Sequence, residues 1–112
     1  VAMIDWIRVR ELRDEIGEDD FAEVVDLFLD EADEVAKNIG NGLAPEEVEA
    51  ALHFLKGSAL NLGFRKLAEL CQIGEKEAAR GRAETVNLEA VVTAYERSKR
   101  AFAAGEKAED AA

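Results

Sequence analysis

The sequence predicts an all-α protein that folds as an antiparallel up-down-up-down four-helix bundle with a short extra N-terminal helix. Apolar residues recur at every third or fourth position through long segments, and no window alternates apolar and polar residues as a half-buried strand would. Most glycines fall between these segments, where helices end. Helices joined by connections of a few residues pack well as antiparallel neighbours, and 112 residues are the usual size of one domain.

Each expected helix has its own apolar face. The first helix is expected near residues 5–16, with Trp6 covering one end of the core. Four longer helices follow, and their apolar stripes run through residues 19–39, 45–62, 67–78 and 88–102. Pro45 followed by two glutamates is typical of a first helical turn, and Asn87 is a suitable N-cap for the last helix. Residues 105–112 carry no apolar period, so we expect one helical domain over residues 1–104 and a disordered tail over residues 105–112.

The charge and the rare residue types exclude several classes of function. Acidic residues outnumber basic residues by 25 to 14, a formal net charge of −11, which disfavours binding to nucleic acid or to a membrane surface. No apolar run is long enough to span a bilayer and no secretory signal is visible, so we expect a cytoplasmic protein. The chain has one histidine and one cysteine, which build neither a disulfide nor a zinc site, and we expect no metal and no cofactor. The cysteine, Cys71, lies on an apolar stripe and is expected in the core.

His53 is the one residue in the sequence that could carry chemistry near neutral pH. At roughly 100° per residue, it lies about 150° from the middle of the apolar stripe of its helix, so its ring is expected in solvent. The same outer face carries Glu46, Glu49, Lys56, Gly57 and Leu60. A lone surface histidine commonly has no chemical role, so its neighbours decide how it is interpreted.

Two neighbours of His53 are informative. A glycine on an exposed helix face costs roughly 1 kcal/mol relative to alanine, and Gly57 stands one turn after the histidine, where its missing side chain leaves space beside the ring. Lys56, three residues after His53, brings an ammonium within reach of a group bound to the ring. Together, exposed histidine, lysine and glycine at this spacing are much more specific than any one of them.

The segment His53-Phe-Leu-Lys56-Gly57-Ser58-Ala-Leu-Asn-Leu-Gly63 resembles the H-x-x-K-G-S-x-x-x-x-G signature of histidine-containing phosphotransfer (HPt) domains of bacterial two-component phosphorelays. Residues 67–71 are similar to the helix that follows in that family, and residues 28–31 are similar more loosely. The family fold is a four-helix bundle with an extra N-terminal helix, which agrees with the bundle inferred from the apolar periods.

The resemblance implies that His53 accepts a phosphoryl group from the aspartyl phosphate of a receiver domain and passes it to the aspartate of another. It implies that Lys56 offsets charge on the phosphoryl oxygens, that Gly57 gives the partner access, and that Gly63 ends the helix. The implied partners are receiver domains of hybrid histidine kinases and response regulators, and the metal belongs to the receiver. Leu60 and Glu49, on the histidine face, are expected to contact that partner.

One position departs from the family pattern. Family members often have glutamine where Glu75 stands, close to the phosphorylated ring. A carboxylate there can accept a hydrogen bond from one ring nitrogen and leave the other free to attack, but it also repels a phosphoryl group. Gln72, one turn earlier, is the other candidate for this contact, and an ordinary solvated glutamate is the alternative for Glu75.

Other interpretations stay open. The chain shows no nucleotide-binding motif, so we expect a phosphocarrier without autokinase activity. The alternative function is a degenerate HPt-like bundle that binds a partner without carrying phosphate, and an enzyme with His53 as general base is a weaker one. We expect a monomer, because the apolar stripes are self-contained. Met3 is the expected natural start of a whole small protein, and a fragment of a larger kinase is the alternative.

Overall fold

The computed structural model describes residues 2–111, and of residues 107–111 only the helical backbone. Its elements are α1 (Trp6–Ile16), α2 (Glu18–Gly40), α3 (Pro45–Leu62), α4 (Arg65–Ala79), the short 3₁₀ turn η1 (Ala83–Thr85) and α5 (Leu88–Ala111). The described residues contain no strand, so the predicted all-α class is confirmed. None of the helices in this part of the chain combines the length and the apolarity needed to cross a membrane.

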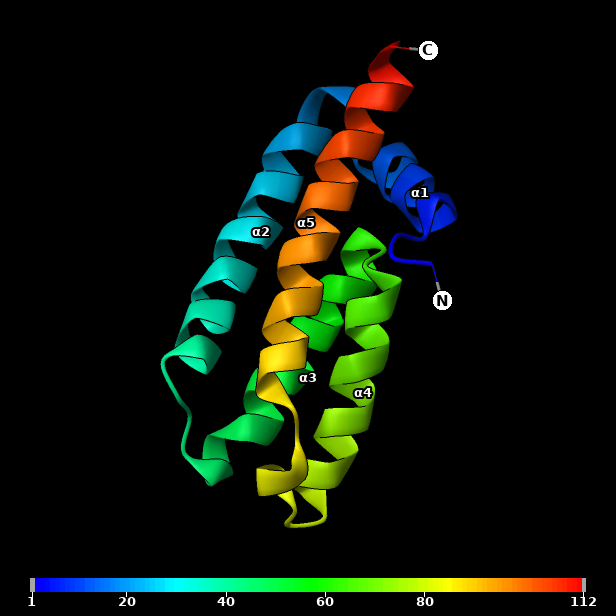
Figure 1. Ribbon diagram of the computed structural model, residues 1–112. Coiled ribbons are helices and arrows are strands. Elements are labelled where there is room, and N and C mark those ends of the chain that lie inside the picture. The colour runs from blue at the N-terminus through cyan, green and yellow to red at the C-terminus, as the bar shows by residue number, and fades with distance from the viewer. Residues whose placement is uncertain (1, 112) are drawn as a thin grey trace.

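Helices α2 to α5 form the bundle, and each runs antiparallel to the next (Figure 1). α3 and α4 are its two shorter members and make an antiparallel pair, whereas α2 and α5 extend beyond the turn that joins α3 to α4. α1 packs at that end, against α2 and α3. The expected arrangement, a bundle with a short N-terminal helix at one end, is confirmed.

Every helix contributes to one continuous core. The largest completely buried side chains are Leu52, Leu55, Leu62, Phe64, Leu67 and Tyr95. Burying a side chain of this size stabilises the fold by roughly 1.5–3 kcal/mol before conformational entropy is counted. Cys71 is also in the core as expected, and burial raises the pKa of its thiol to about 12. The thiol is therefore protonated and unreactive at neutral pH.

The expected start signals of the helices are present. Pro45 is the first residue of α3, and the carboxylate of Glu47 accepts a hydrogen bond from the amide of Ala44 at 3.0 Å. The Asn87 side chain accepts one from the amide of Ala90 at 3.0 Å, as an N-cap does. The side chain of Tyr95 joins α5 to α2, because its hydroxyl donates to the carboxylate of Asp33 at 2.5 Å and lies 3.1 Å from the backbone oxygen of Leu29.

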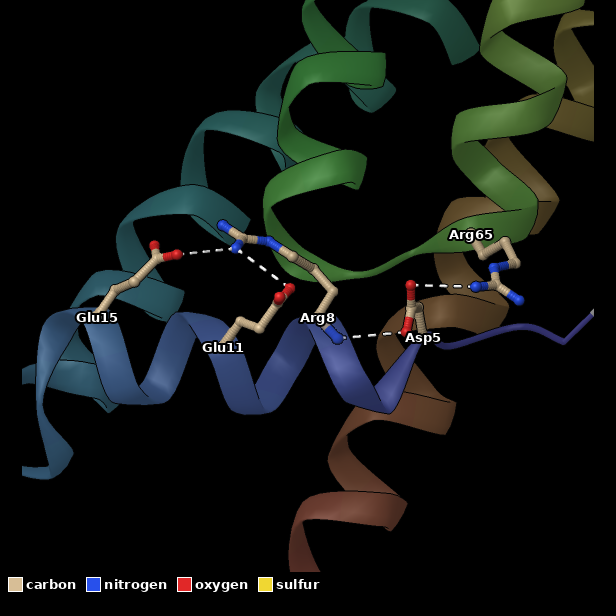
Figure 2. Close-up of polar contacts among 5 residues, drawn as sticks. All are labelled: Asp5, Arg8, Glu11, Glu15 and Arg65. Atoms are coloured by element: carbon tan, nitrogen blue, oxygen red, sulfur yellow. Dashed lines mark hydrogen bonds and ion pairs between the residues drawn. The ribbon is translucent and has the colours of Figure 1, made fainter.

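The start of α1 is attached to the turn between α3 and α4 (Figure 2). The amide of Asp5 donates to the backbone oxygen of Gly63 at 2.7 Å, and the Asp5 carboxylate accepts from the amide of Arg8 and from the guanidinium of Arg65. Gly63 has φ +77°, and a Cβ there would lie 2.7 Å from the backbone oxygen of Asp5. Glycine is therefore required at this position both to end α3 and to let α1 approach.

The last helix continues past the boundary expected at residue 104. The Trp6 ring stacks on Phe102 with centroids 5.9 Å apart, and Gly105 lies directly beside it. The carboxylate of Glu106 accepts two hydrogen bonds of 2.8 Å from the guanidinium of Arg13. Gly105 and Glu106, the first two residues of the expected tail, contact α1 although they lack an apolar period. The domain boundary itself stays a prediction. Residue 112 lies outside the described residues.

The contact between Gly105 and Trp6 can be tested with Gly105→Ala. An added Cβ would collide with Cζ2 of Trp6, so the indole must leave its place against Phe102. The lost stacking and burial exceed the gain in helix propensity, and we expect the free energy of unfolding to fall by about 1 kcal/mol. Emission from Trp6, the only tryptophan, should shift to the red. The exposed control Ala104→Ser should keep the emission maximum of wild type. If Gly105→Ala also keeps the emission and the stability of wild type, the contact between Gly105 and Trp6 is contradicted.

Candidate functional site

His53 lies in the middle of α3 and points away from the core. Its side chain is 71% exposed, which agrees with the position computed from the helical period. Leu52, directly before His53, and Leu55, two positions after His53, are both completely buried. These two leucines hold the backbone that carries the ring, so an exposed side chain stands on a rigid base.

One carboxylate connects His53 to Lys56. Oε2 of Glu75 lies 2.6 Å from Nδ1 of His53, and its Oε1 lies 2.5 Å from Nζ of Lys56. The hydrogen bond from Lys56 lowers the pKa of Glu75, burial opposes this shift, and His53 adds to it. Glu75 is therefore ionised at neutral pH and can only accept hydrogen bonds. Its side chain is 16% exposed, which places the carboxylate between α4 and α3.

Gln72 has a different partner. Its Oε1 accepts a hydrogen bond from Nζ of Lys56 at 3.0 Å. The choice left open by the sequence thus has a geometric answer: Glu75 contacts the ring, and Gln72 contacts the lysine. Lys56 is only 22% exposed, and its ammonium is held on α4 by these two side chains.

Gly74 allows α4 to come this close to α3. A Cβ on Gly74 would lie 2.7 Å from Cδ1 of Leu52 and 3.0 Å from Cγ1 of Val86. Leu52 directly precedes His53, and Gly74 directly precedes Glu75, so this close contact brings these two candidate site residues together. This is the packing reason for a glycine inside a helix, which costs roughly 1 kcal/mol of helix propensity.

The surface beside His53 is open. A Cβ built on Gly57 would meet no atom within 4 Å, and Leu60 is 58% exposed. A shallow depression next to the ring is lined by Glu46, Glu49, Ala50, His53 and Glu75. Gly57, Leu60 and Glu49 therefore all lie outside the core on the histidine face.

Phe54 is a large apolar side chain at this site that the sequence analysis missed. It directly follows His53 and is 39% exposed. The helical count that placed His53 in solvent puts Phe54 about 110° from the middle of the apolar stripe, so the same signal could have found it.

The comparisons with known proteins name the family. The family model described as Hpt domain matches residues 23–101, well over half of the chain. A comparison with curated proteins and one with solved structures found no match. The chain belongs to the Hpt domain family, whose members are phosphocarriers that act through histidine in two-component phosphorelays, with receiver domains and kinases as partners. The matched residues include all of α3 and α4, and hence His53, Lys56 and Glu75.

The role of Gly74 can be tested with Gly74→Ala. The added methyl collides with Leu52 and Val86, and overpacking of this kind costs about 1–3 kcal/mol, which outweighs the gain in helix propensity. We expect chemical denaturation to show a loss of roughly 1 kcal/mol. The matched control is Gly57→Ala, where the methyl meets nothing and stability should rise by about 0.5–1 kcal/mol. Equal gains in both variants would show that the close approach at Gly74 is unimportant.

Proposed function

We propose that His53 carries a phosphoryl group, which it receives from the aspartyl phosphate of one receiver domain and passes to the aspartate of another. The observation that carries this proposal is the exposed ring bound at Nδ1 by Glu75, with no hydrogen-bond partner for Nε2 among the described residues. The proposed partners are receiver domains of hybrid histidine kinases and of response regulators.

The chemistry requires a neutral imidazole with its proton on Nδ1. The lone pair on Nε2 then attacks the phosphorus, the N–P bond forms, and the P–O bond to the receiver breaks. The electron pair of that bond returns to the aspartate oxygen. In the second transfer, an aspartate oxygen of the next receiver attacks the same phosphorus, and the N–P electron pair returns to Nε2.

Lys56 and the open surface suit this role. An ammonium one helical turn from the ring stabilises negative charge on the phosphoryl oxygens during displacement. Gly57 leaves space for a receiver to approach Nε2. Leu60 and Phe54 supply exposed apolar area around the histidine, and we propose that these two residues, with Glu49, contact the receiver.

The phosphoacceptor can be tested with His53→Gln. We expect this variant to accept no radiolabelled phosphate from a phosphorylated receiver domain of the same genome. Its free energy of unfolding should stay within about 0.5 kcal/mol of wild type, because the side chain is exposed.

A label on the wild type that is labile to acid and stable to alkali identifies phosphohistidine and serves as a control. Undiminished labelling of His53→Gln would contradict the assignment of the site. Receiver binding without any labelling of the wild type would favour a protein-binding module instead.

The open surface predicts that Gly57→Gln weakens transfer while stabilising the isolated protein. A long side chain here gains roughly 0.5–1 kcal/mol of helix propensity but occupies the space that the receiver needs.

Leu60→Glu should weaken receiver binding in calorimetry and leave the thermal melt nearly unchanged, because Leu60 is already exposed.

Gly57→Ala, whose methyl is small, is the matched control and should transfer almost normally. Normal transfer by Gly57→Gln would show that access does not depend on this glycine. Unfolding of Leu60→Glu would place that leucine in the core.

A further inference from the structure

The outer face of α4 carries a row of residues with the spacing that pairs helices in coiled coils. α4 lies at the edge of the bundle, with α3, α5 and η1 as its neighbours (Figure 1). The row, called here the α4 seam, follows heptad spacings of four, three and four and consists of Lys66, Leu70, Ile73 and Glu77. Ile73 is 56% exposed. The α4 seam therefore has an apolar centre and opposite charges at its two ends.

We propose that the α4 seam binds the same seam of a second copy of this chain, with the two helices antiparallel and related by a two-fold axis. Antiparallel helices pair residues whose numbers have a constant sum, and Lys66 with Glu77 has the same sum as Leu70 with Ile73. The seam is therefore complementary to itself, as a two-fold interface requires. The monomer expected from the sequence rests on apolar stripes that face the core, and Ile73 lies outside the core.

The groove between α4 and α5 offers an apolar surface to the isoleucine of the second copy. A depression in this groove is lined by Leu70, Ile73, Val86 and Ala90 among others. A second depression continues along the same two helices and shares Leu70 and Ala90 with the first. In the antiparallel pair, Ile73 of the second copy lies opposite Leu70 and over this groove. Each exposed isoleucine is thereby removed from water, which is the main driving force for association.

The charges beside the seam favour the antiparallel orientation. Glu69 and Lys76 flank the seam, both are exposed, and neither forms an ion pair with another of the described residues. In the antiparallel pair, Glu69 of one copy meets Lys76 of the other, and Lys66 meets Glu77. A parallel pair would instead bring like charges together, and such flanking charges set the orientation of paired helices. Glu77 also accepts from Arg82 of its own chain at 2.7 Å, and its two oxygens have capacity for both cations.

The α4 seam and the histidine site lie on opposite sides of α4. Ile73 and Glu75 are two residues apart, which is about 200° around the helix. Glu75 contacts His53 on α3, whereas Ile73 lines the groove between α4 and α5. A dimer formed through the seam therefore leaves His53 open in both copies, so the inference goes beyond the proposed function and does not depend on it.

Sedimentation equilibrium of the full chain measures the dimer directly. Each copy carries a formal net charge of −11, so the salt is kept at about 0.15 M to screen the repulsion between copies. We expect the mass to rise from monomer to dimer between roughly 10 µM and 1 mM, as for a small interface. Ile73→Glu should weaken association by at least roughly tenfold, because it places two carboxylates in the apolar centre. The matched control is Leu27→Glu, which changes a leucine of similar exposure on α2 and should dimerise like wild type.

The antiparallel orientation can be tested by exchanging the charges of Glu69 and Lys76. Either single variant, Glu69→Lys or Lys76→Glu, places like charges opposite each other in both halves of the dimer. We expect each to weaken association by roughly threefold or more, and this loss to shrink in about 1 M salt. The double variant Glu69→Lys/Lys76→Glu restores opposite charges and should dimerise like wild type.

A wild-type chain that stays monomeric up to about 1 mM would overturn the proposal, as would an Ile73→Glu variant that associates like wild type. A double variant no better than the two single variants would overturn the antiparallel pairing. Circular dichroism confirms that each variant is folded. His53→Gln should dimerise like wild type, and Ile73→Glu should accept phosphate like wild type, so failure of the proposed function leaves this test intact.

Discussion

The site depends on the close packing of α3 and α4 at Gly74. A side chain at that position would collide with Leu52 and Val86, so the absence of a Cβ sets the separation of the two helices. Leu52 and Gly74 each directly precede a candidate site residue, and this close contact therefore fixes the position of His53 relative to Glu75. The contacts of Lys56 with Glu75 and Gln72 follow from the same approach. A packing constraint in the core thus determines the geometry of polar groups on the surface.

The carboxylate of Glu75 gives the site its electrostatic character. In a chain with a net charge of −11, a further exposed glutamate would ordinarily be unremarkable. This one is only 16% exposed and lies between an ammonium and an imidazole, which keeps it ionised through the lowered pKa. A carboxylate at this position repels a negatively charged phosphoryl group. Its 2.6 Å contact with Nδ1 of His53 holds the exposed ring against α4.

The N-terminal helix and the end of α5 complete the domain away from the site. Gly63, the last residue of the histidine signature, ends α3 and also accepts the amide of Asp5, so the same glycine links the signature to α1. Trp6 then covers Phe102, and Arg13 binds Glu106. α1, Phe102 and Glu106 lie outside residues 23–101. The part of the chain that matches the family is therefore stabilised by segments on both sides of it.

The sequence by itself determined the helices, their order and the exposure of His53, because these follow from apolar periods and local start and stop signals. The same count could have identified Phe54. The sequence could not decide between Glu75 and Gln72 as the partner of the ring, nor explain Gly74, because both depend on how far α4 rotates and approaches α3. It also gave no sign that Gly105 and Glu106 contact Trp6 and Arg13, which lie more than 90 positions earlier. Local patterns encode which face of a helix is buried, whereas only tertiary structure brings side chains from distant segments into contact.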